Sequence, residues 1–301
     1  MLALFGPTAS GKSELALAIA ERSPSEIVLA DSMQLYRGLP VLTTQPTALE
    51  QARVRHHLVG LWELSQDGSV GAYAPYAHRA IDEVLARGAQ PIVVGGTGLY
   101  LRAALVELRL PPPVDAAVRA ELERAYDEIG GEAMLARLDR SDPAAAGRLH
   151  ANDRRRVVRA LELAHVGSSL APAQDRLWSD HLRRPVRIVV LRCELDELTR
   201  RIRARTREML AAGAFDEVRA LIDSGTCLSR TAQRILGVRE VGAVIEGRMS
   251  RRACEDEIVL RTRQYARRQQ TWARKIPGAI VLDAANGAAQ NADTIVAAHA
   301  V

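Results

Sequence analysis

A phosphate-binding loop near the N-terminus constrains the fold more than any other feature of this chain. Gly6-Pro7-Thr8-Ala9-Ser10-Gly11-Lys12-Ser13 fits the pattern Gly, four residues, Gly-Lys and then Ser or Thr. An apolar run at residues 2–5 precedes it, and a helical run at residues 14–22 follows it. In such a loop, backbone N–H groups and a helix N-terminus converge on a phosphate chain. Lys12 supplies a positive charge, and the Ser13 hydroxyl is a ligand for phosphate-bound Mg²⁺.

The strong preference for arginine elsewhere in the chain supports a specific role for Lys12. The chain has only two lysines, Lys12 and Lys275, against 39 arginines. A lysine kept in this position suggests that a compact ammonium group matters there. The alternative is an ordinary glycine-rich turn before a helix, which the strand–loop–helix context disfavours.

Charge is unevenly distributed along the 301 residues, which carry a net charge of +5. Residues 1–112 have a balance of −1, and the remainder has +6. Basic clusters in the second part indicate a polyanionic partner, although solvated helix faces are an equal alternative on charge alone. No apolar run is long enough for a membrane span, and no signal peptide is seen. Three scattered cysteines fit a reducing compartment, so we expect a cytoplasmic protein.

Buried strands are expected to alternate with helices in the N-terminal third. Residues 26–30 and 91–94 are short apolar runs, and residues 77–87 have helical periodicity between them. This order predicts an α/β fold with a parallel sheet and helices on both faces. Ligands of such sheets bind at the carboxyl ends of the strands. The phosphate loop, Asp31 and Gly95-Gly96-Thr97 should therefore meet at one edge.

An inserted helical module is expected in the middle of the chain. Residues 111–113 are three prolines, and from there to about residue 184 the sequence is helical and polar without a convincing strand. We therefore expect a core of residues 1–112 and 185–301, and an insert of residues 113–184. Strands are predicted at 185–193 and 279–282, a helix capped by Asp196 and stopped by Gly213, and a long basic helix at 255–275.

Asp31 is the candidate reacting group. A carboxylate at a strand end beside a phosphate loop can act as a general base or as an outer-shell partner of Mg²⁺. Its alternative role is to cap the following turn. Gly95-Gly96 would let a ligand approach the backbone closely, with the Thr97 hydroxyl available to it, although such a turn is weak evidence. His56-His57 and the tryptophans are interpreted as structural.

Six ordered motifs resemble the tRNA dimethylallyltransferases. They are GPTASGKS, DSMQLYRG, PIVVGGTGLY, DPAAAGRLHANDRRRVVRALEL, RILGVRE and YARRQQTW, and they extend from Gly6 to Trp272. The resemblance implies a P-loop core with an inserted domain that binds the tRNA anticodon stem-loop. It also implies transfer of a dimethylallyl group from dimethylallyl diphosphate to N6 of adenosine 37, with Mg²⁺, by a monomeric enzyme.

The resemblance also implies roles for individual residues. Asp31 matches the general base for adenine N6, Thr97 matches a threonine lining the reaction channel, and Arg205 matches an arginine on the donor diphosphate. Positions matched to tRNA contacts are Asp31, Ser32, Met33, Gln34, Thr97, Arg119, Arg155, Arg156, Val157, Val158, Arg159, Arg234, Ile235, Leu236, Gly237, Val238 and Arg239. The chain departs from the family pattern at Leu42, Gln45, Arg155, Val238 and Arg267.

Three other functions share parts of this pattern. A P-loop kinase would use the same loop with a γ-phosphate donor, and the insert could then serve as a lid. A prenyltransferase acting on free adenine nucleotides would share the loop and Asp31, but it would leave the basic insert without a purpose. A non-catalytic RNA-binding protein would not need Lys12, Ser13 and Asp31 together.

Overall fold

The computed structural model describes residues 1–108, 114–170 and 182–298. The chain divides into two compact units, a core unit of Met1–Leu108 with His181–Val301 and an insert unit of Arg109–Asp180. The boundaries expected from sequence, after residues 112 and 184, differ from these by four residues each. Residues 111–113, which suggested the first boundary, lie outside the described residues, as does Trp178.

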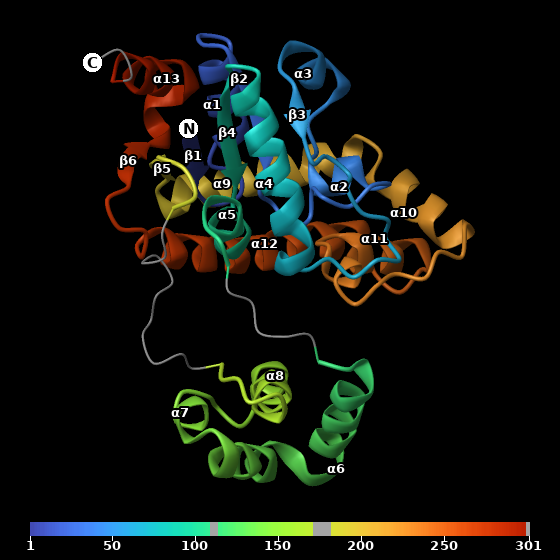
Figure 1. The fold of residues 1–301 in the computed structure, drawn as a ribbon. Coiled ribbons are helices and arrows are strands. Elements are labelled where there is room, and N and C mark those ends of the chain that lie inside the picture. The colour runs from blue at the N-terminus through green and yellow to red at the C-terminus, as the bar shows by residue number, and fades with distance from the viewer. Residues whose placement is uncertain (109–113, 171–181, 299–301) are drawn as a thin grey trace. The chain divides into compact units, whose positions relative to one another are not determined.

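The core unit is built on a six-stranded parallel sheet with the order β3-β2-β4-β1-β5-β6 (Figure 1). This confirms the predicted α/β fold. The strands are β1 (Leu2–Phe5), β2 (Ser25–Leu29), β3 (His56–His57), β4 (Gln90–Gly95), β5 (Arg187–Arg192) and β6 (Ile280–Asp283). Five of them begin and end within two residues of the predicted bounds. The sequence did not indicate β3, a two-residue edge strand that pairs with β2.

Helices cover both faces of the sheet, as expected. The chain moves from β1 to β2 in one direction across the sheet and from β3 to β4 in the other, so right-handed crossovers place the connecting helices on opposite faces. Helix α1 (Lys12–Ala20) packs with α13 (Gly287–Ala297), and α4 (Val70–Ala86) packs with α5 (Gly98–Leu105). All four residues of β1 are buried, because neither face of the central sheet meets water.

Helix α12 (Arg251–Ala273) runs along the edge at which the central strands end (Figure 1). It packs against α9 (Leu195–Ala211), α5 and α11 (Val238–Ile245). The remaining elements of the core unit are α2 (Pro40–Thr43), α3 (Ala48–Arg53), α10 (Ala214–Asp223) and 3₁₀ turns at Ala232–Arg234 and Ala284–Asn286. The segment between β2 and α3 thus contains one helical turn, α2.

Helices are the only regular elements among the described residues of the insert unit, as predicted. It contains α6 (Ala116–Ser141), which bends at Gly130, α7 (Pro143–Ala146) and α8 (Arg154–His165). Helices α6 and α8 pack against each other, and Met134, Leu138 and Val157 are fully buried between them. The unit therefore has a hydrophobic core of its own.

Several helix starts differ from the sequence prediction. Helix α12 begins at Arg251, four residues before the expected residue 255. Helix α9 begins after Glu194 rather than at a cap formed by Asp196, which lies in the first turn. A carboxylate is still favourable there, because it faces the positive end of the helix dipole. Helix α4 starts seven residues before residue 77, where Ser69 Oγ accepts a hydrogen bond from the Ala72 N–H. Gly213 does follow the last turn of α9, with a left-handed φ of 116°.

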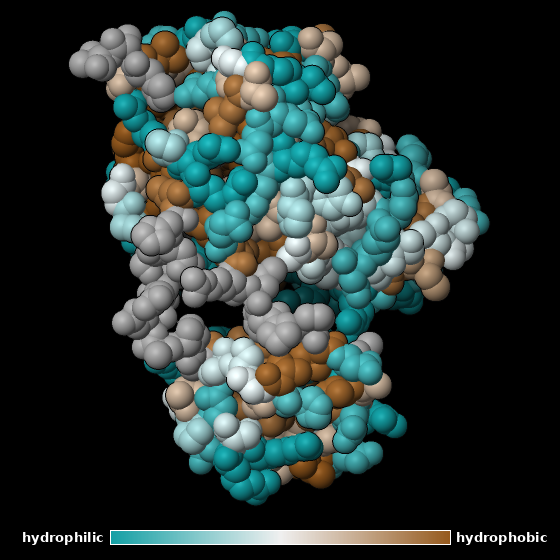
Figure 2. Space-filling view, viewed as in Figure 1, coloured by the Kyte–Doolittle hydropathy of each residue, from teal (hydrophilic) through white to brown (hydrophobic). Residues whose placement is uncertain are grey.

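The surface carries mostly hydrophilic residues with apolar residues scattered among them on the face shown in Figure 2. Among the described residues, no helix has both the length and the apolar character needed to cross a membrane.

Candidate active site

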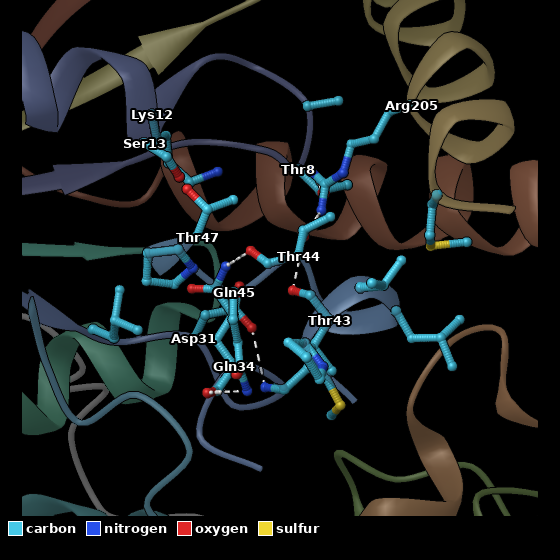
Figure 3. Close-up of a pocket in the computed structure, with 18 of the residues that line it drawn as sticks. Thr8, Lys12, Ser13, Asp31, Gln34, Thr43, Thr44, Gln45, Thr47 and Arg205 are labelled. Atoms are coloured by element: carbon cyan, nitrogen blue, oxygen red, sulfur yellow. Dashed lines mark hydrogen bonds between the residues drawn. The ribbon is translucent and has the colours of Figure 1, made fainter. Parts of the chain in front are cut away.

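The three features predicted to meet lie at one edge of the sheet. Strands β2, β4 and β1 are neighbours, with Leu29 opposite Val94 and Phe5 opposite Gly95. The phosphate loop follows β1, Asp31 lies two residues after β2, and Thr97 lies two residues after β4. A pocket of about 810 Å³ opens beside them, and Figure 3 shows 18 of the residues that line it.

The phosphate loop has the backbone of an anion cradle. Ala9 and Gly11 have φ of 62° and 92°, and alternation of left- and right-handed residues turns successive N–H groups to one side. The N–H groups in the first turn of α1 have no partner within the helix. The Ser10 hydroxyl is buried, and it has no hydrogen-bond partner among the described residues. These donors leave the loop suited to a phosphate chain.

Lys12 places an ammonium group inside this loop. Its Nζ donates a hydrogen bond to the Pro7 carbonyl at 2.7 Å. The pKa of Lys12 is lowered to about 8, mainly by burial; the charge of Asp31 opposes this shift, and the charge of Arg205 adds to it. A negative ligand would restore the charged form, so Lys12 is matched to an anion that arrives from outside the chain.

Arg205 reaches the same pocket from α9. Its guanidinium donates to Thr8 Oγ1 at 3.1 Å and also contacts Thr44 Oγ1 (Figure 3). Burial lowers the pKa of Arg205, although an arginine remains charged at physiological pH. Arg205 therefore joins the phosphate loop to the loop after α2, and it adds a second positive charge.

Asp31 faces Lys12 and Arg205 across the pocket. Its Oδ1 accepts a hydrogen bond from the Met33 N–H at 3.1 Å, which is the turn-capping role considered above. Among the residues that the structure describes, no protein donor contacts Oδ2. Both roles are thus compatible, because one oxygen fixes the turn while the other can accept a proton.

Thr97 connects the loops after β2 and β4. Its Oγ1 lies 3.3 Å from Ser32 Oγ and 3.0 Å from the Tyr265 hydroxyl of α12. Burial raises the pKa of Tyr265, so its phenol stays protonated. The hydroxyl chain holds Thr97 beside Asp31 at the edge of the sheet.

The glycines near Thr97 are needed because other parts of the protein pack closely against their backbone. We had expected a ligand to occupy that space. A Cβ on Gly95 would lie 2.2 Å from the Ala30 carbonyl oxygen, and one on Gly98 would lie 2.3 Å from the Trp272 ring. A Cβ on Gly96 would lie 2.2 Å from Gln269 Nε2. Helix α12 and the end of β2 therefore explain these glycines.

The loop after α2 forms one wall of the pocket (Figure 3). Gln34 Nε2 donates to the Thr44 carbonyl at 2.6 Å, and Gln45 Nε2 donates to the Gln34 carbonyl at 3.0 Å. Gln45, one of the departures from the family pattern, is thus satisfied by backbone carbonyls. Leu42 fits beside Gly237, where it would meet any added Cβ.

The residues matched to tRNA contacts divide into exposed and buried positions. In the insert unit, Arg155 and Arg156 are exposed, whereas Val157 and Val158 are fully buried in the core. Arg119 and Arg159 both form ion pairs with Glu162. The structure therefore gives the two valines a packing role, since their side chains cannot reach a partner.

The segment of residues 234–239 shows the same division in the core unit. Arg234 and Arg239 are exposed, whereas Ile235, Gly237 and Val238 are buried, and Leu236 lines the pocket. Ser32, Met33 and Gln34 are half-buried next to Asp31. Only the exposed arginines of this segment present a charge to a partner.

Sequence reasoning missed two kinds of residue near the site. Glu217 of α10 accepts hydrogen bonds from the N–H groups of Val41 and Leu42 at 2.6 and 3.0 Å, and so holds α2 in place. Tyr265 and Gln269 contact the edge of the sheet from α12. Their spacing of four residues was a signal that they share one helix face.

Comparisons with known proteins identify the family of the chain. The family model described as IPP transferase matches residues 34–276. The tRNA dimethylallyltransferases of Thermobifida fusca and Geobacter sulfurreducens are 41% and 40% identical to the chain. Each alignment covers 92% of this chain, and they cover 88% and 89% of the two relatives.

Solved structures share the fold over nearly the whole chain. The full-length tRNA isopentenylpyrophosphate transferase of Bacillus halodurans matches with a TM-score of 0.70 at 31% identity, covering 98% of this chain and 95% of that one. A eukaryotic dimethylallyltransferase acting on tRNA matches with a TM-score of 0.82 at 26% identity, covering 100% and 79%. The chain belongs to the IPP transferase family.

Proposed function

We propose that the chain transfers a dimethylallyl group from dimethylallyl diphosphate to N6 of adenosine 37, beside the anticodon of tRNAs. The products are N6-isopentenyladenosine and diphosphate. The observation that carries this proposal is the arrangement of Lys12, Arg205 and Asp31 around one pocket. The family relatives are named for this transfer to tRNA.

The two cations suit a leaving diphosphate. Breaking the C1–O bond of the donor leaves charge on the diphosphate and an electron-poor allylic carbon. The loop N–H groups, Lys12 and Arg205 stabilise that developing charge in a pocket where water screens it poorly. Because these groups are already in position, little reorganisation is needed when the bond breaks.

Mg²⁺ is proposed as a partner of the diphosphate. Among the described residues, no cluster of three or more His, Cys, Asp or Glu side chains could hold a metal by itself. The exposed Ser13 hydroxyl in the first turn of α1 fits an ion held mainly by phosphate oxygens and water. When bound there, the ion neutralises phosphate charge.

Asp31 is proposed as the general base. The exocyclic N6 of adenine is a weak nucleophile, and it must lose a proton as its bond to C1 forms. Oδ2 of Asp31 accepts that proton, while the hydrogen bond from Met33 to Oδ1 fixes the orientation of the carboxylate. The neighbouring Thr97 and Ser32 hydroxyls, which lie 3.3 Å apart, are proposed to contact the incoming base.

The insert unit is proposed to bind the anticodon stem-loop. Arg155 and Arg156 are exposed at the start of α8, where they can contact phosphates. Phosphate contacts would offset the cost of moving the adenine out of its stack, a few kcal/mol. We propose that the enzyme acts as a monomer in the cytoplasm, where tRNA is used.

One labelling experiment separates this proposal from its alternatives. The protein is incubated with labelled dimethylallyl diphosphate, labelled ATP, AMP and unmodified tRNA. We expect label from the prenyl donor alone, on tRNA alone. Phosphate transferred from ATP would favour a kinase, prenylated AMP would favour a nucleotide prenyltransferase, and no transfer at all would favour an RNA-binding protein.

A further inference from the structure

Helix α12 presents three side chains to the active-site edge of the sheet. Tyr265, Gln269 and Trp272 are spaced by four and three residues, so they lie on one helix face. Tyr265 contacts the Thr97 hydroxyl, and Trp272 lies against Gly98. Gln269, between them, contacts two separate loops of the site.

The amide of Gln269 connects the phosphate loop to the turn after β4. Its Oε1 accepts a hydrogen bond from the Thr8 N–H at 2.8 Å, and its Nε2 donates to the Gly96 carbonyl at 2.8 Å. The side chain is 3% exposed, so these bonds face no competition from water. Each loop therefore has its position defined relative to the other by one side chain.

The chemistry at this position calls for an amide. Thr8 N–H can only donate and Gly96 O can only accept, so the side chain between them must offer one acceptor and one donor. A leucine would leave two buried backbone groups without partners, and a carboxylate would leave the Gly96 carbonyl facing an anion. A Cβ at position 96 would lie 2.2 Å from Nε2, so any larger residue there would displace the Gln269 amide.

The Thr8 N–H is also withdrawn from the anion cradle by this bond. Thr8 contributes its Oγ1 to Arg205 instead, so one residue is held by α12 through its backbone and by α9 through its side chain. The phosphate loop and the turn after β4, which carries Thr97, are thus both held by α12.

We infer that Gln269 is a positioning residue that sets the distance between the diphosphate cradle and the acceptor side of the active site. The inference rests on the proposed prenyl transfer for its effect on turnover, but its effect on diphosphate binding can be measured without that reaction. Holding the two loops at a fixed separation matters, because the allylic carbon and N6 must meet within bonding reach.

The test uses Gln269→Glu and inorganic pyrophosphate as the probe. At about pH 8 the introduced carboxylate cannot donate to Gly96 O, and it adds negative charge behind the cradle, so we expect the Kd for pyrophosphate to rise roughly tenfold to a hundredfold. At low pH the protonated carboxyl has one donor and one acceptor, as the amide does. The ratio of variant to wild-type Kd should therefore fall towards one as the pH is lowered.

Matched variants separate positioning from general stability. Gln270→Glu introduces the same charge on the neighbouring residue, whose amide donates a hydrogen bond to the Cys193 carbonyl at 3.2 Å. We expect this control to keep the wild-type Kd within about threefold, since it does not contact the phosphate loop. Gly96→Ala displaces the Gln269 amide from the opposite side, and it should weaken pyrophosphate binding without a pH-dependent recovery.

The outcomes are distinct. A Gln269→Glu enzyme that binds pyrophosphate as the Gln270→Glu control does at every pH would overturn the inference. Failure of both Gln269→Glu and Gly96→Ala to fold would also overturn it, in favour of a purely structural role. If wild-type protein binds pyrophosphate but transfers no prenyl group to tRNA, the proposed function fails while the positioning role stands on the binding data.

Discussion

Raising the pH through the pKa of Lys12 is expected to weaken the binding of dimethylallyl diphosphate. Burial holds this pKa near 8 instead of the ordinary 10.5. The shift corresponds to a cost of about 3 kcal/mol for keeping the ammonium charged in the free pocket. A bound diphosphate favours the charged form, so above about pH 8 binding must take up a proton.

The size of the effect follows from this linkage. Below the pKa, Lys12 is already charged and pH has no effect through this group. Above it, each further pH unit lowers the fraction of charged Lys12, and the affinity with it, by up to about tenfold. We therefore expect the Kd to be roughly ten times higher at about pH 9 than at about pH 7.5. The lower of these two pH values lies above the range in which the diphosphate of the donor itself gains protons.

Isothermal titration calorimetry measures both the Kd for the donor and the number of protons taken up on binding. Titrations in buffers of different ionisation enthalpy should show uptake of about one proton per donor bound at about pH 9, and of none at about pH 7. Lys12→Met is the matched variant, because it keeps the length of the side chain and removes the charge. Its Kd should be high and independent of pH, and the wild-type Kd should approach it at high pH. An unchanged wild-type Kd across this range, or no proton uptake at about pH 9, would refute the reasoning.

Three further predictions address other parts of the molecule. Asp31→Asn should lower turnover ~10²-fold or more with little change in tRNA affinity. It should also lower the pH above which donor binding weakens, because the charge of Asp31 partly opposes the lowering of the Lys12 pKa. Wild-type turnover in this variant would contradict the general-base role. Arg156→Ala should weaken tRNA binding and reduce its salt dependence, measured by filter binding, while pyrophosphate affinity stays unchanged. Leu138→Ala, in the fully buried core of the insert, should destabilise that unit by about 2–5 kcal/mol in denaturant unfolding and leave pyrophosphate binding intact; loss of pyrophosphate binding would show that the core unit depends on the insert.

The sequence allowed the local parts of the site to be predicted. A buried parallel strand is a continuous apolar run, so β1, β2 and β4 could be identified together with the polar residues that follow them. The phosphate loop is also recognisable from local sequence, because its glycines, Lys12 and Ser13 act within one turn of chain. The parallel topology then brought Asp31 and Thr97 to the loop without any long-range information.

The remaining contacts depend on residues that are far apart in the chain. Gln269 is separated from Thr8 by 261 residues, and Glu217 from Val41 by 176. The spacing of Tyr265 and Gln269 indicates a shared helix face, but nothing in the sequence near Gln269 or Glu217 indicates which distant backbone groups these side chains bind. Gly95 and Gly96 show the same limit: their sequence suggested ligand approach, whereas the atoms that exclude a Cβ belong to Ala30 and Gln269.

The preference for lysine at position 12, in a chain that otherwise uses arginine, has a physical reason in the pocket. Arg205 already supplies a charge that cannot titrate, and it lies close enough to lower the pKa of Lys12. A second guanidinium would keep two permanent charges together in a buried pocket of the free enzyme. An ammonium with a pKa of about 8 can release its proton when no anion is present and regain it when the diphosphate binds. With one permanent and one titratable cation, the pocket thus reaches its full positive charge only when the diphosphate is bound.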